Sequence, residues 1–224
     1  MLVSQDYLDD VLVRMAYHSS GIEGNTISLP QTVSIILEGT LPSNSKSIRE
    51  FYEIENHKQT FEYIGSLLVA EQPLTLAEVK EIHSMLTDRL QHDRGQFKSQ
   101  QNAIRGAEFK TASPFETPQL MEQWVDNTNY RLDLAVNENE YLEVLADTHI
   151  QFEGIHPFSD GNGRTERMVL LFLSMKYLSA PVVIRKEWRG RYMEFLWEQD
   201  VSGLVSLFKE SIAFERERIK EFGN

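Results

Sequence analysis

The chain has no cysteine among its 224 residues, which excludes disulfide bonds and zinc sites built on thiolates. This absence fits a reducing compartment, and we expect the protein in the cytoplasm. Long apolar runs are also missing, because the longest, from Met168 to Met175, is interrupted by Ser174 and is too short to cross a bilayer. The first residues carry acidic side chains where a signal peptide needs basic ones, so we expect neither a signal peptide nor a membrane partner.

Positive charge is scarce, since 22 Lys and Arg stand against 34 Asp and Glu, for a formal net charge of −12. Such a surface repels phosphate backbones, so we expect no nucleic-acid partner bound over a broad face. Any phosphate that the protein binds must be held in a local pocket. Hydrophobic residues make up 41% of the chain, and neither a repeat nor a linker divides it. We therefore expect one domain over residues 1–224.

Helical periodicity dominates the sequence and predicts an all-α fold. The expected helices span residues 8–22, 31–37, 48–70, 75–90, 118–135, 140–155, 162–178, 188–199 and 201–222. The helix that begins at Asn162 is apolar on nearly all sides, so we expect it to be central and buried. Weak alternation from Phe97 to Phe109 predicts a small β-hairpin that turns near Arg105 and Gly106.

The stretch from His156 to Arg167, HPFSDGNGRTER, leads from a loop into this buried helix. Gly161 and Gly163 allow the backbone to bend tightly and to approach a ligand closely. The first N–H groups of a helix lack intrahelical partners and its dipole adds positive potential, so the bend suits an anion. Arg164 lies three positions before Arg167, so both guanidinium groups can face the same polyphosphate.

Two more residues of this stretch offer chemistry. Asp160 supplies a hard oxygen ligand for a magnesium ion that bridges phosphate oxygens. His156 can accept a proton from an attacking hydroxyl near neutral pH. Each feature alone is usually structural, because Asn-Gly is a common turn and most histidines before proline are not catalytic. Their coincidence in one short stretch favours a function.

The stretch resembles the HxFx(D/E)GNGRxxR signature of the Fic family. The matching residues are His156, Phe158, Asp160, Gly161, Asn162, Gly163, Arg164 and Arg167. The resemblance continues upstream through His149, Phe152 and Ile155 and covers most of the chain. It implies a helical bundle around a central buried helix with a β-hairpin flap. It also implies transfer of AMP from ATP to a Ser, Thr or Tyr hydroxyl of a target protein, or of the protein itself, with release of pyrophosphate.

The resemblance implies a role for each motif residue. His156 would be the general base for the hydroxyl, and Phe158 would anchor the loop in the core. Asp160 would hold Mg²⁺ between the α- and β-phosphates, while Arg164 and Arg167 would bind the β- and γ-phosphates. The residues that would hold phosphates mainly through the bend and the helix N-terminus are Gly161, Asn162 and Gly163.

Residues 19–24, SSGIEG, resemble the (S/T)xxxE(G/N) inhibitory motif of Fic proteins that carry an inhibitory helix before the core. The specified positions are Ser19, Glu23 and Gly24. We accordingly assign residues 1–27 to the inhibitory segment and residues 28–224 to the Fic core. Glu23 would lie at a helix C-terminus, where the dipole disfavours an anion unless a cation is near. Arg167 would be that cation, and the pair would occupy the arginine that the γ-phosphate needs.

Three alternatives to inhibited AMP transfer remain. The same site, with Glu23 and a metal positioning water, could remove AMP from a modified protein. A catalytically silent interaction module is disfavoured because His156, Asp160 and both motif arginines are intact. A protein kinase is disfavoured because the divergent kinase branch alters the GNGR core that this chain keeps. The sequence leaves open the target and a possible homo-oligomer.

Several residues outside the motif carry weaker expectations. His149 is expected to be a hydrogen-bonded core histidine, and Glu166 is expected to be exposed, turned away from the arginine face. The resemblance implies that Tyr192 helps to wall the adenine, and that residues 98–111 form the flap that binds a target by strand addition. A local basic cluster is expected to be mostly a solvated face; its members are Arg185, Lys186, Arg189 and Arg191.

Overall fold

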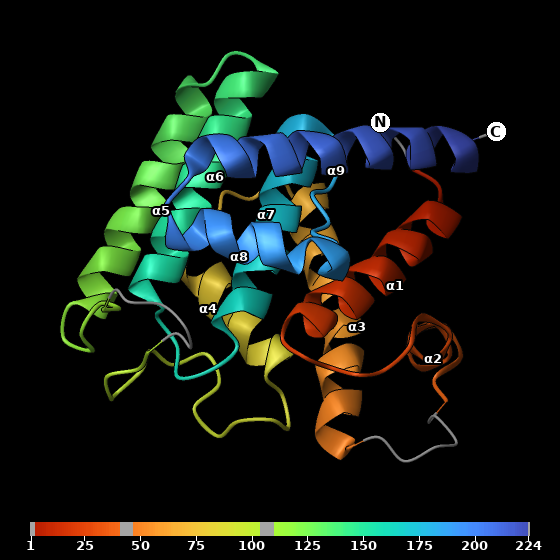
Figure 1. Ribbon diagram of the computed structural model, residues 1–224, viewed down its shortest axis with the longest axis horizontal. Coiled ribbons are helices and arrows are strands. Elements are labelled where there is room, and N and C mark those ends of the chain that lie inside the picture. The colour runs from red at the N-terminus through yellow and green to blue at the C-terminus, as the bar shows by residue number, and fades with distance from the viewer. Residues whose placement is uncertain (1–2, 41–46, 104–109, 224) are drawn as a thin grey trace.

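A computed structural model of the protein describes residues 3–40, 47–103 and 110–223 (Figure 1). Its elements are α1 (Gln5–Ile22), α2 (Leu29–Val33), the π-helix η1 (Ser34–Glu38), α3 (Ile48–Val69), α4 (Leu76–Leu86), α5 (Thr117–Leu134), α6 (Glu138–Ile155), α7 (Asn162–Leu178), the 3₁₀-helix η2 (Lys186–Trp188), α8 (Arg189–Trp197) and α9 (Val201–Phe222). Within the described ranges every regular element is helical, which confirms the all-α expectation. No helix in these ranges combines the length and the hydropathy that a membrane span requires.

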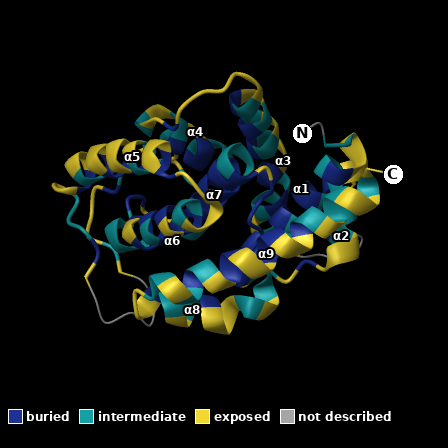
Figure 2. Cartoon of the chain, turned by 90° about the horizontal axis from the view of Figure 1, so that it is seen from above, coloured by how far each residue is buried: buried dark blue, intermediate teal, exposed yellow. Residues whose placement is uncertain are grey.

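Helix α7 lies at the centre of the molecule. With the exception of Gly163, every residue from Asn162 to Ser174 is buried. Helices α6, α4, α3 and α1 pack against it, and Figure 2 shows it in the interior with exposed faces on the helices around it. Such burial follows from a sequence that is apolar on nearly all sides of the helix. The expectation of a central buried helix is confirmed.

Helix α1 belongs to the same packed body as the rest of the chain. One face contributes Tyr7, Val11 and Met15 to the core that surrounds α7. Its other face joins a second, smaller apolar cluster, whose members in α1 are Leu12, Val13 and Ala16. In Figure 1, α1 starts near the end of α9 and runs beneath it toward α3. The assigned division at residue 27 therefore does not separate two hydrophobic cores.

A buried charge fixes the first half of α1 to α9. Arg14 donates from Nη2 to Oε2 of Glu215 at 2.8 Å, and the Tyr7 hydroxyl donates to the same oxygen at 2.9 Å. Burial and the negative charge of Glu215 raise the pKa of Tyr7 above its usual value, so this hydroxyl keeps the proton that it donates. Glu215 is 1% exposed, and Arg14 of α1 supplies the positive charge that balances it.

Most predicted helix bounds agree with the structure to within three residues, and the largest difference is at the end of α4. Helices α7 and α9 have the predicted bounds. The helix that Thr75 caps ends at Leu86 and does not continue to residue 90. There Thr87 turns its hydroxyl back to the carbonyl of His83, and Arg89 adopts a left-handed backbone with φ of 59°. A left-handed residue cannot continue a helix, so the apolar pattern extends past the true end.

The predicted β-hairpin is wrong for the residues that the structure describes. Residues 97–103 and 110–114 contain no strand, and the predicted turn at Arg105 and Gly106 lies outside the described residues. Side chains connect the two arms: Gln101 donates to the carbonyl of Thr111 at 3.1 Å and to its hydroxyl at 2.8 Å. A weak apolar alternation cannot distinguish an arm held by side chains from a paired strand.

Candidate functional site

The motif bend is fixed by its own side chains. The Asn162 amide donates to the carbonyl of Phe158 and accepts from its N–H, both at 2.8 Å. Phe158 is fully buried and stacks on His83, with ring centroids 3.7 Å apart. Gly161 has a left-handed φ of 81°, and a Cβ there would lie 2.9 Å from Thr87. The predicted anchoring by Phe158 is confirmed. The glycine-rich bend leads into α7, which starts at Asn162 as the sequence predicted.

The carboxylate of Glu23 lies at the opening of this bend. A Cβ on Gly163 would lie 2.6 Å from Oε1 of Glu23 and 2.9 Å from Nη1 of Arg167. The carboxylate therefore rests directly on the first turn of α7, where the helix dipole favours negative charge. The glycine is required at position 163 because any side chain would fill the space that the anion uses.

The predicted pair between Glu23 and Arg167 is present. Arg167 is 3% exposed and donates from Nη2 to Oε1 of Glu23 at 2.6 Å. It also donates to the hydroxyl and the carbonyl of Ser19, each at 3.0 Å. Burial raises the pKa of Glu23, but the charges of Arg167 and Arg164 outweigh it and hold that pKa below its usual value. Of the three specified positions of the pattern, Ser19 and Glu23 contact Arg167. The third, Gly24, follows Glu23 in the chain and has a left-handed φ of 99°.

Arg164 is buried but incompletely paired. Its side chain is 3% exposed, and Nη2 lies 3.9 Å from Oδ1 of Asp160. Its Nε and Nη1 are buried and have no hydrogen-bond partner among the residues that the structure describes. Buried donors are nearly always paired in folded proteins, and leaving one unpaired is costly. Two unpaired guanidinium nitrogens beside an anion cradle indicate a ligand with several acceptor oxygens.

Asp160 lies at the edge of the bend and is 52% exposed. Arg49 at the start of α3 donates to its Oδ2 at 2.8 Å, and the N–H of Gly161 donates to Oδ1 at 2.7 Å. Burial raises the pKa of Asp160, but the charge of Arg164 and the bond from Arg49 outweigh it and lower that pKa. The carboxylate is therefore ionised. Arg49 also donates to Glu53 at 3.0 Å, so a second acceptor lies beside it.

The part of the chain that the structure describes holds no cluster of three acidic or histidine side chains that could bind a metal alone. Mg²⁺ does not need such a cluster, because it usually binds one or two carboxylates together with water and substrate phosphates. One ionised, half-exposed carboxylate next to an anion cradle fits that mode of binding. Asp160 therefore suits Mg²⁺ that arrives with a nucleotide.

His156 sits where α6 ends, in a left-handed conformation with φ of 51°. Its N–H donates to the carbonyl of Phe152 at 2.8 Å, and its carbonyl accepts from the side chain of Asn102 at 3.1 Å. Asn102 also donates to the carbonyl of Phe158 at 2.7 Å. It thus fixes both sides of the loop. Sequence reasoning missed Asn102, since no local pattern links it to a loop 54 positions away.

The expectation for Glu166 is wrong. This side chain is 2% exposed and contacts Nδ1 of His149, whose Nε2 lies 2.8 Å from the hydroxyl of Tyr192. Burial raises the pKa of Glu166 well above its usual value and lowers that of His149 to about 3. Because α7 is buried on all sides, a position turned away from the arginines faces another helix and not water. The expectation of a core histidine at position 149 is confirmed.

Tyr192 lies deep in the same network. It is 1% exposed, and burial raises the pKa of its hydroxyl well above the usual value. The structure brings Tyr192 to the inner side of the site, against His149, and not to a surface where a base could stack. A role at the adenine stays a prediction.

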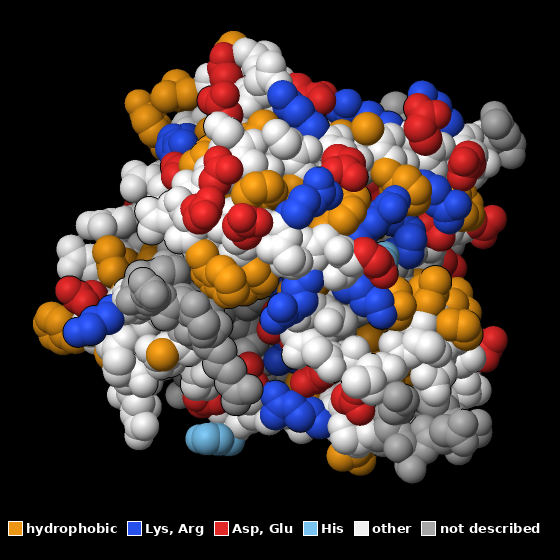
Figure 3. Space-filling model, viewed as in Figure 1, with side chains coloured by type: hydrophobic (Ala, Val, Ile, Leu, Met, Phe, Trp, Pro, Cys, Tyr) orange, Lys and Arg blue, Asp and Glu red, His pale blue; other side chains and the backbone are white. Residues whose placement is uncertain are grey.

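The basic cluster splits into two parts. Arg191 pairs with Glu210 at 3.1 Å, and both side chains are 50% exposed, as in a solvated face. Figure 3 shows Lys and Arg side chains mixed with Asp and Glu on the side of the molecule that carries α8 and α9. Arg189 instead donates to the carbonyl of Ile22 at 2.8 Å, and Lys186 lies over the ring of Tyr17. These two residues contact the C-terminal half of α1, which ends one residue before Glu23.

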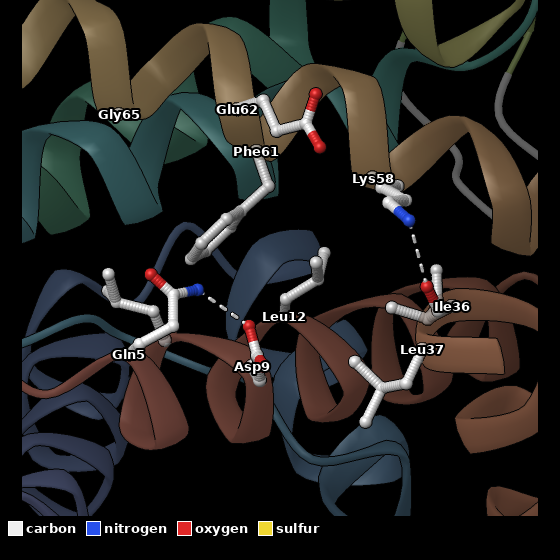
Figure 4. Close-up of a pocket in the computed structure, with 10 residues that line it drawn as sticks. Gln5, Asp9, Leu12, Ile36, Leu37, Lys58, Phe61, Glu62 and Gly65 are labelled. Atoms are coloured by element: carbon white, nitrogen blue, oxygen red, sulfur yellow. Dashed lines mark hydrogen bonds between the residues drawn. The ribbon is translucent and has the colours of Figure 1, made fainter.

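A separate pocket of about 350 Å³ lies between α1, η1 and α3 (Figure 4). Its polar side chains bind within the protein: Gln5 donates to Asp9 at 2.8 Å, and Lys58 donates to the carbonyl of Ile36 at 3.2 Å. No motif residue lines this pocket. The candidate site is therefore the bend at α7 and not this pocket.

Comparison with known proteins agrees with the geometry. Residues 73–174 match the Fic/DOC family model, so this part of the chain is a Fic/DOC domain. It is 34% identical over 181 residues to "Protein adenylyltransferase Fic" of Drosophila willistoni, which covers 80% of this chain and 35% of that protein.

Two solved structures are similar over nearly the whole chain. A Fic domain containing signaling protein from Bacteroides thetaiotaomicron has a TM-score of 0.85 at 26% identity, covering 98% of this chain and 93% of that one. Fic-1 from C. elegans has a TM-score of 0.81 at 26% identity, covering 99% of this chain and 66% of that one. The chain spans only 35% of the length of the D. willistoni protein, so the similarity concerns one part of that protein.

Proposed function

We propose that this domain transfers AMP from ATP to a hydroxyl group of a protein. The observation that carries the proposal is Arg164, whose buried Nε and Nη1 lack partners among the described residues beside a bend already occupied by a carboxylate. An unpaired buried donor costs about 1–3 kcal/mol, and a polyphosphate would pair with both nitrogens. Relatives named protein adenylyltransferase support the choice of ATP and of AMP transfer.

The residues of the chain would supply positioning and charge. The hydroxyl oxygen attacks the α-phosphorus, the bond to the bridging oxygen of the β-phosphate breaks, and pyrophosphate leaves. His156 takes the hydroxyl proton. Arg164 and Arg167, on the first turns of a buried helix, hold the phosphates in place and stabilise the charge that develops on the leaving group. A rigid bend closed by Asn162 keeps these groups in one geometry.

Asp160 would be the protein ligand of Mg²⁺. The ion supplies neutralisation of the phosphate charge when it is bound. Its ligand carboxylate is ionised and faces the same bend, but it is paired with Arg49 in this structure. Arg49 would turn to Glu53, which it already contacts, when the metal binds Asp160.

Glu23 would hold the activity low. Its carboxylate lies on Gly163 and pairs with Arg167, so a phosphate at that position would meet a like charge and lose an arginine. ATP would then bind with its phosphates misplaced for attack. Ser19 reinforces the arrangement because it holds the same guanidinium through its hydroxyl and its carbonyl.

The protein substrate remains a matter of proposal. We expect an extended segment of the target, or of the protein itself, to lie along residues 98–111 and to pair through its main chain. The described arms of this segment are held by side chains such as Lys98, which donates to the carbonyl of Ile155 at 3.0 Å. We also propose that the protein acts in the cytoplasm, which its lack of cysteine supports.

The test compares wild type and Glu23→Gly, each incubated with ATP and Mg²⁺, by intact mass and by transfer of labelled AMP to added proteins. We expect AMP incorporation in Glu23→Gly and much less in wild type. The double variant that combines Glu23→Gly with His156→Ala should incorporate none. Absence of incorporation in Glu23→Gly, with ATP binding intact, would contradict AMP transfer. Release of AMP from modified protein that falls in Glu23→Gly would instead show the reverse reaction.

A further inference from the structure

Glu153 lies beside the proposed base and takes no part in the mechanism above. It belongs to the last turn of α6, three positions before His156. Its Oε2 is 3.4 Å from Nδ1 of His156, and the two side chains are only 12% and 17% exposed. The backbone of His156 is already fixed through Phe152 and Asn102. What the backbone leaves undetermined is the orientation of the ring and the nitrogen that carries its proton.

The imidazole has one nitrogen that is shielded from water. Nδ1 of His156 is buried and has no hydrogen-bond partner among the described residues. The nearest acidic oxygen is the one on Glu153. A neutral imidazole is a donor at one nitrogen and an acceptor at the other, and the partner of one nitrogen decides the state of the other. A carboxylate facing Nδ1 favours the proton there and leaves the lone pair on Nε2.

The charge of Glu153 acts on several neighbours. It helps to raise the pKa of Glu166, after burial, and it also acts on Arg167 and on Tyr192. The Glu153 carboxylate therefore acts both on the proposed base, through the contact at 3.4 Å, and on the electrostatics of Arg167.

We propose that Glu153 is a positioning residue for His156: its carboxylate accepts the Nδ1–H of the imidazole and leaves Nε2 to take the hydroxyl proton. The present separation of 3.4 Å is longer than a hydrogen bond, as is common before a substrate is bound. A carboxylate has this role toward histidine in serine proteases, where replacement by the amide lowers turnover through the wrong tautomer. The inference rests on the proposed function, because it assigns a supporting group to the same base.

The test uses Glu23→Gly as the active parent and adds Glu153→Gln or Glu153→Asp. The matched control is Glu143→Gln, which removes an exposed carboxylate from the same helix. We expect Glu153→Gln to lower kcat for AMP transfer by roughly 10- to 100-fold, since general base catalysis contributes at least that much. The KM for ATP should stay within about twofold because the phosphate contacts are unchanged. Glu153→Asp should recover part of the loss, and Glu143→Gln should match the parent.

A second readout does not depend on activity. Nitrogen-15 NMR of the His156 ring in the parent should show a protonated Nδ1 and an unprotonated Nε2, and Glu153→Gln should shift this balance toward the other tautomer. A parent ring protonated at Nε2, or a Glu153→Gln variant with unchanged kcat, would overturn the proposal. If the parent transfers no AMP, the proposed function fails, while the ring spectrum still decides the role of Glu153.

Discussion

Two ion pairs hold α1, one at its middle and one just after its C-terminus, and they differ in how well water can replace them. At the middle, Arg14 and Glu215 are 13% and 1% exposed, and the hydroxyl of Tyr7, near the start of the helix, also binds the carboxylate. At the C-terminus, Arg167 is 3% exposed but Glu23 is 44% exposed. Loss of the first pair would leave a buried charge without its counter-charge, whereas Glu23 can turn toward water. The helix can therefore stay attached through its middle and be released at its C-terminus.

This difference indicates how inhibition would be relieved. Detaching α1 as a whole would expose core side chains such as Tyr7 and Met15 and would break the buried pair with α9. A movement confined to the last turn changes the contacts of Ser19, Ser20, Ile22 and Glu23 and leaves the rest of α1 in place. The smaller movement is the less costly one. Four experiments test the comparison, in order of expected effect.

The largest effect is expected from Glu215→Ala. Removing this carboxylate leaves the Tyr7 hydroxyl buried without its acceptor and leaves Arg14 paired with Asp10, at 2.8 Å. We expect a loss of about 3–5 kcal/mol in the free energy of unfolding, measured by urea titration. Glu138→Ala is the control, because its pair with Arg216 also joins α6 to α9 but is 46% and 42% exposed. It should change the free energy of unfolding by less than about 1 kcal/mol. Equal losses in the two variants would show that the buried pair is no more important for stability than the exposed one.

An intermediate effect is expected from Glu23→Gln, which keeps the length of the side chain and removes its charge. Arg167 retains both contacts with Ser19, and water can reach the guanidinium where the charged carboxylate of Glu23 was. We expect the free energy of unfolding to change by about 1 kcal/mol or less, and AMP transfer to rise by roughly tenfold. A drop in stability as large as that of Glu215→Ala would mean that the releasable end is also structural.

A smaller effect is expected from Arg49→Gln in the Glu23→Gly background. This pair is exposed on both sides, at 54% and 52%, so it competes only weakly for Asp160. Half-maximal AMP transfer should need about two- to fivefold less Mg²⁺, and about 0.5 M salt should remove most of the difference. Arg49→Lys should behave like the parent. A difference that persists at high salt would show that the Asp160 pair is not a screened surface contact.

The smallest effect is expected from pH. The pKa of Glu23 lies below its usual value of 4.5, so its pair with Arg167 is intact above that range and is lost only as pH falls through the lowered value. The ratio of Glu23→Gly to wild-type activity should therefore stay constant between about pH 6 and pH 8. Measurement of both rates across this range checks it. A ratio that falls toward 1 below about pH 7 would require a Glu23 that takes up a proton near neutral pH.

The sequence predicted the parts of the site that lie in one segment. The bounds of α7, its burial and the glycine bend before it follow from a continuous apolar helix behind a glycine-rich turn, whereas the closure of this bend by the side chain of Asn162 was not predicted. The pair of Glu23 with Arg167 joins positions 144 apart, and only the combination of an anion at a helix end with the family resemblance suggested it. Arg49 and Asn102 were missed because their partners lie far along the chain and neither has a local pattern.

The error at Glu166 has a different cause. Helical spacing fixes the direction of a side chain relative to its neighbours on the helix but not what that direction meets. On an amphipathic helix the face away from the core is water, whereas α7 has another helix there. The error near residues 97–109 arose because side-chain bonds such as that of Gln101 leave no periodic signal. Both errors arose because contacts between segments far apart in the sequence determine the structure at these positions.

The bare backbone at Gly163 has a consequence for how this protein can change by mutation. Any added carbon there would exclude the Glu23 carboxylate, and under the proposed function it would exclude a nucleotide phosphate from the same space. A substitution at that position cannot free the domain from restraint without disabling it. A genetic screen for permanently active clones should therefore return changes clustered at the end of the first helix and leave the glycine untouched.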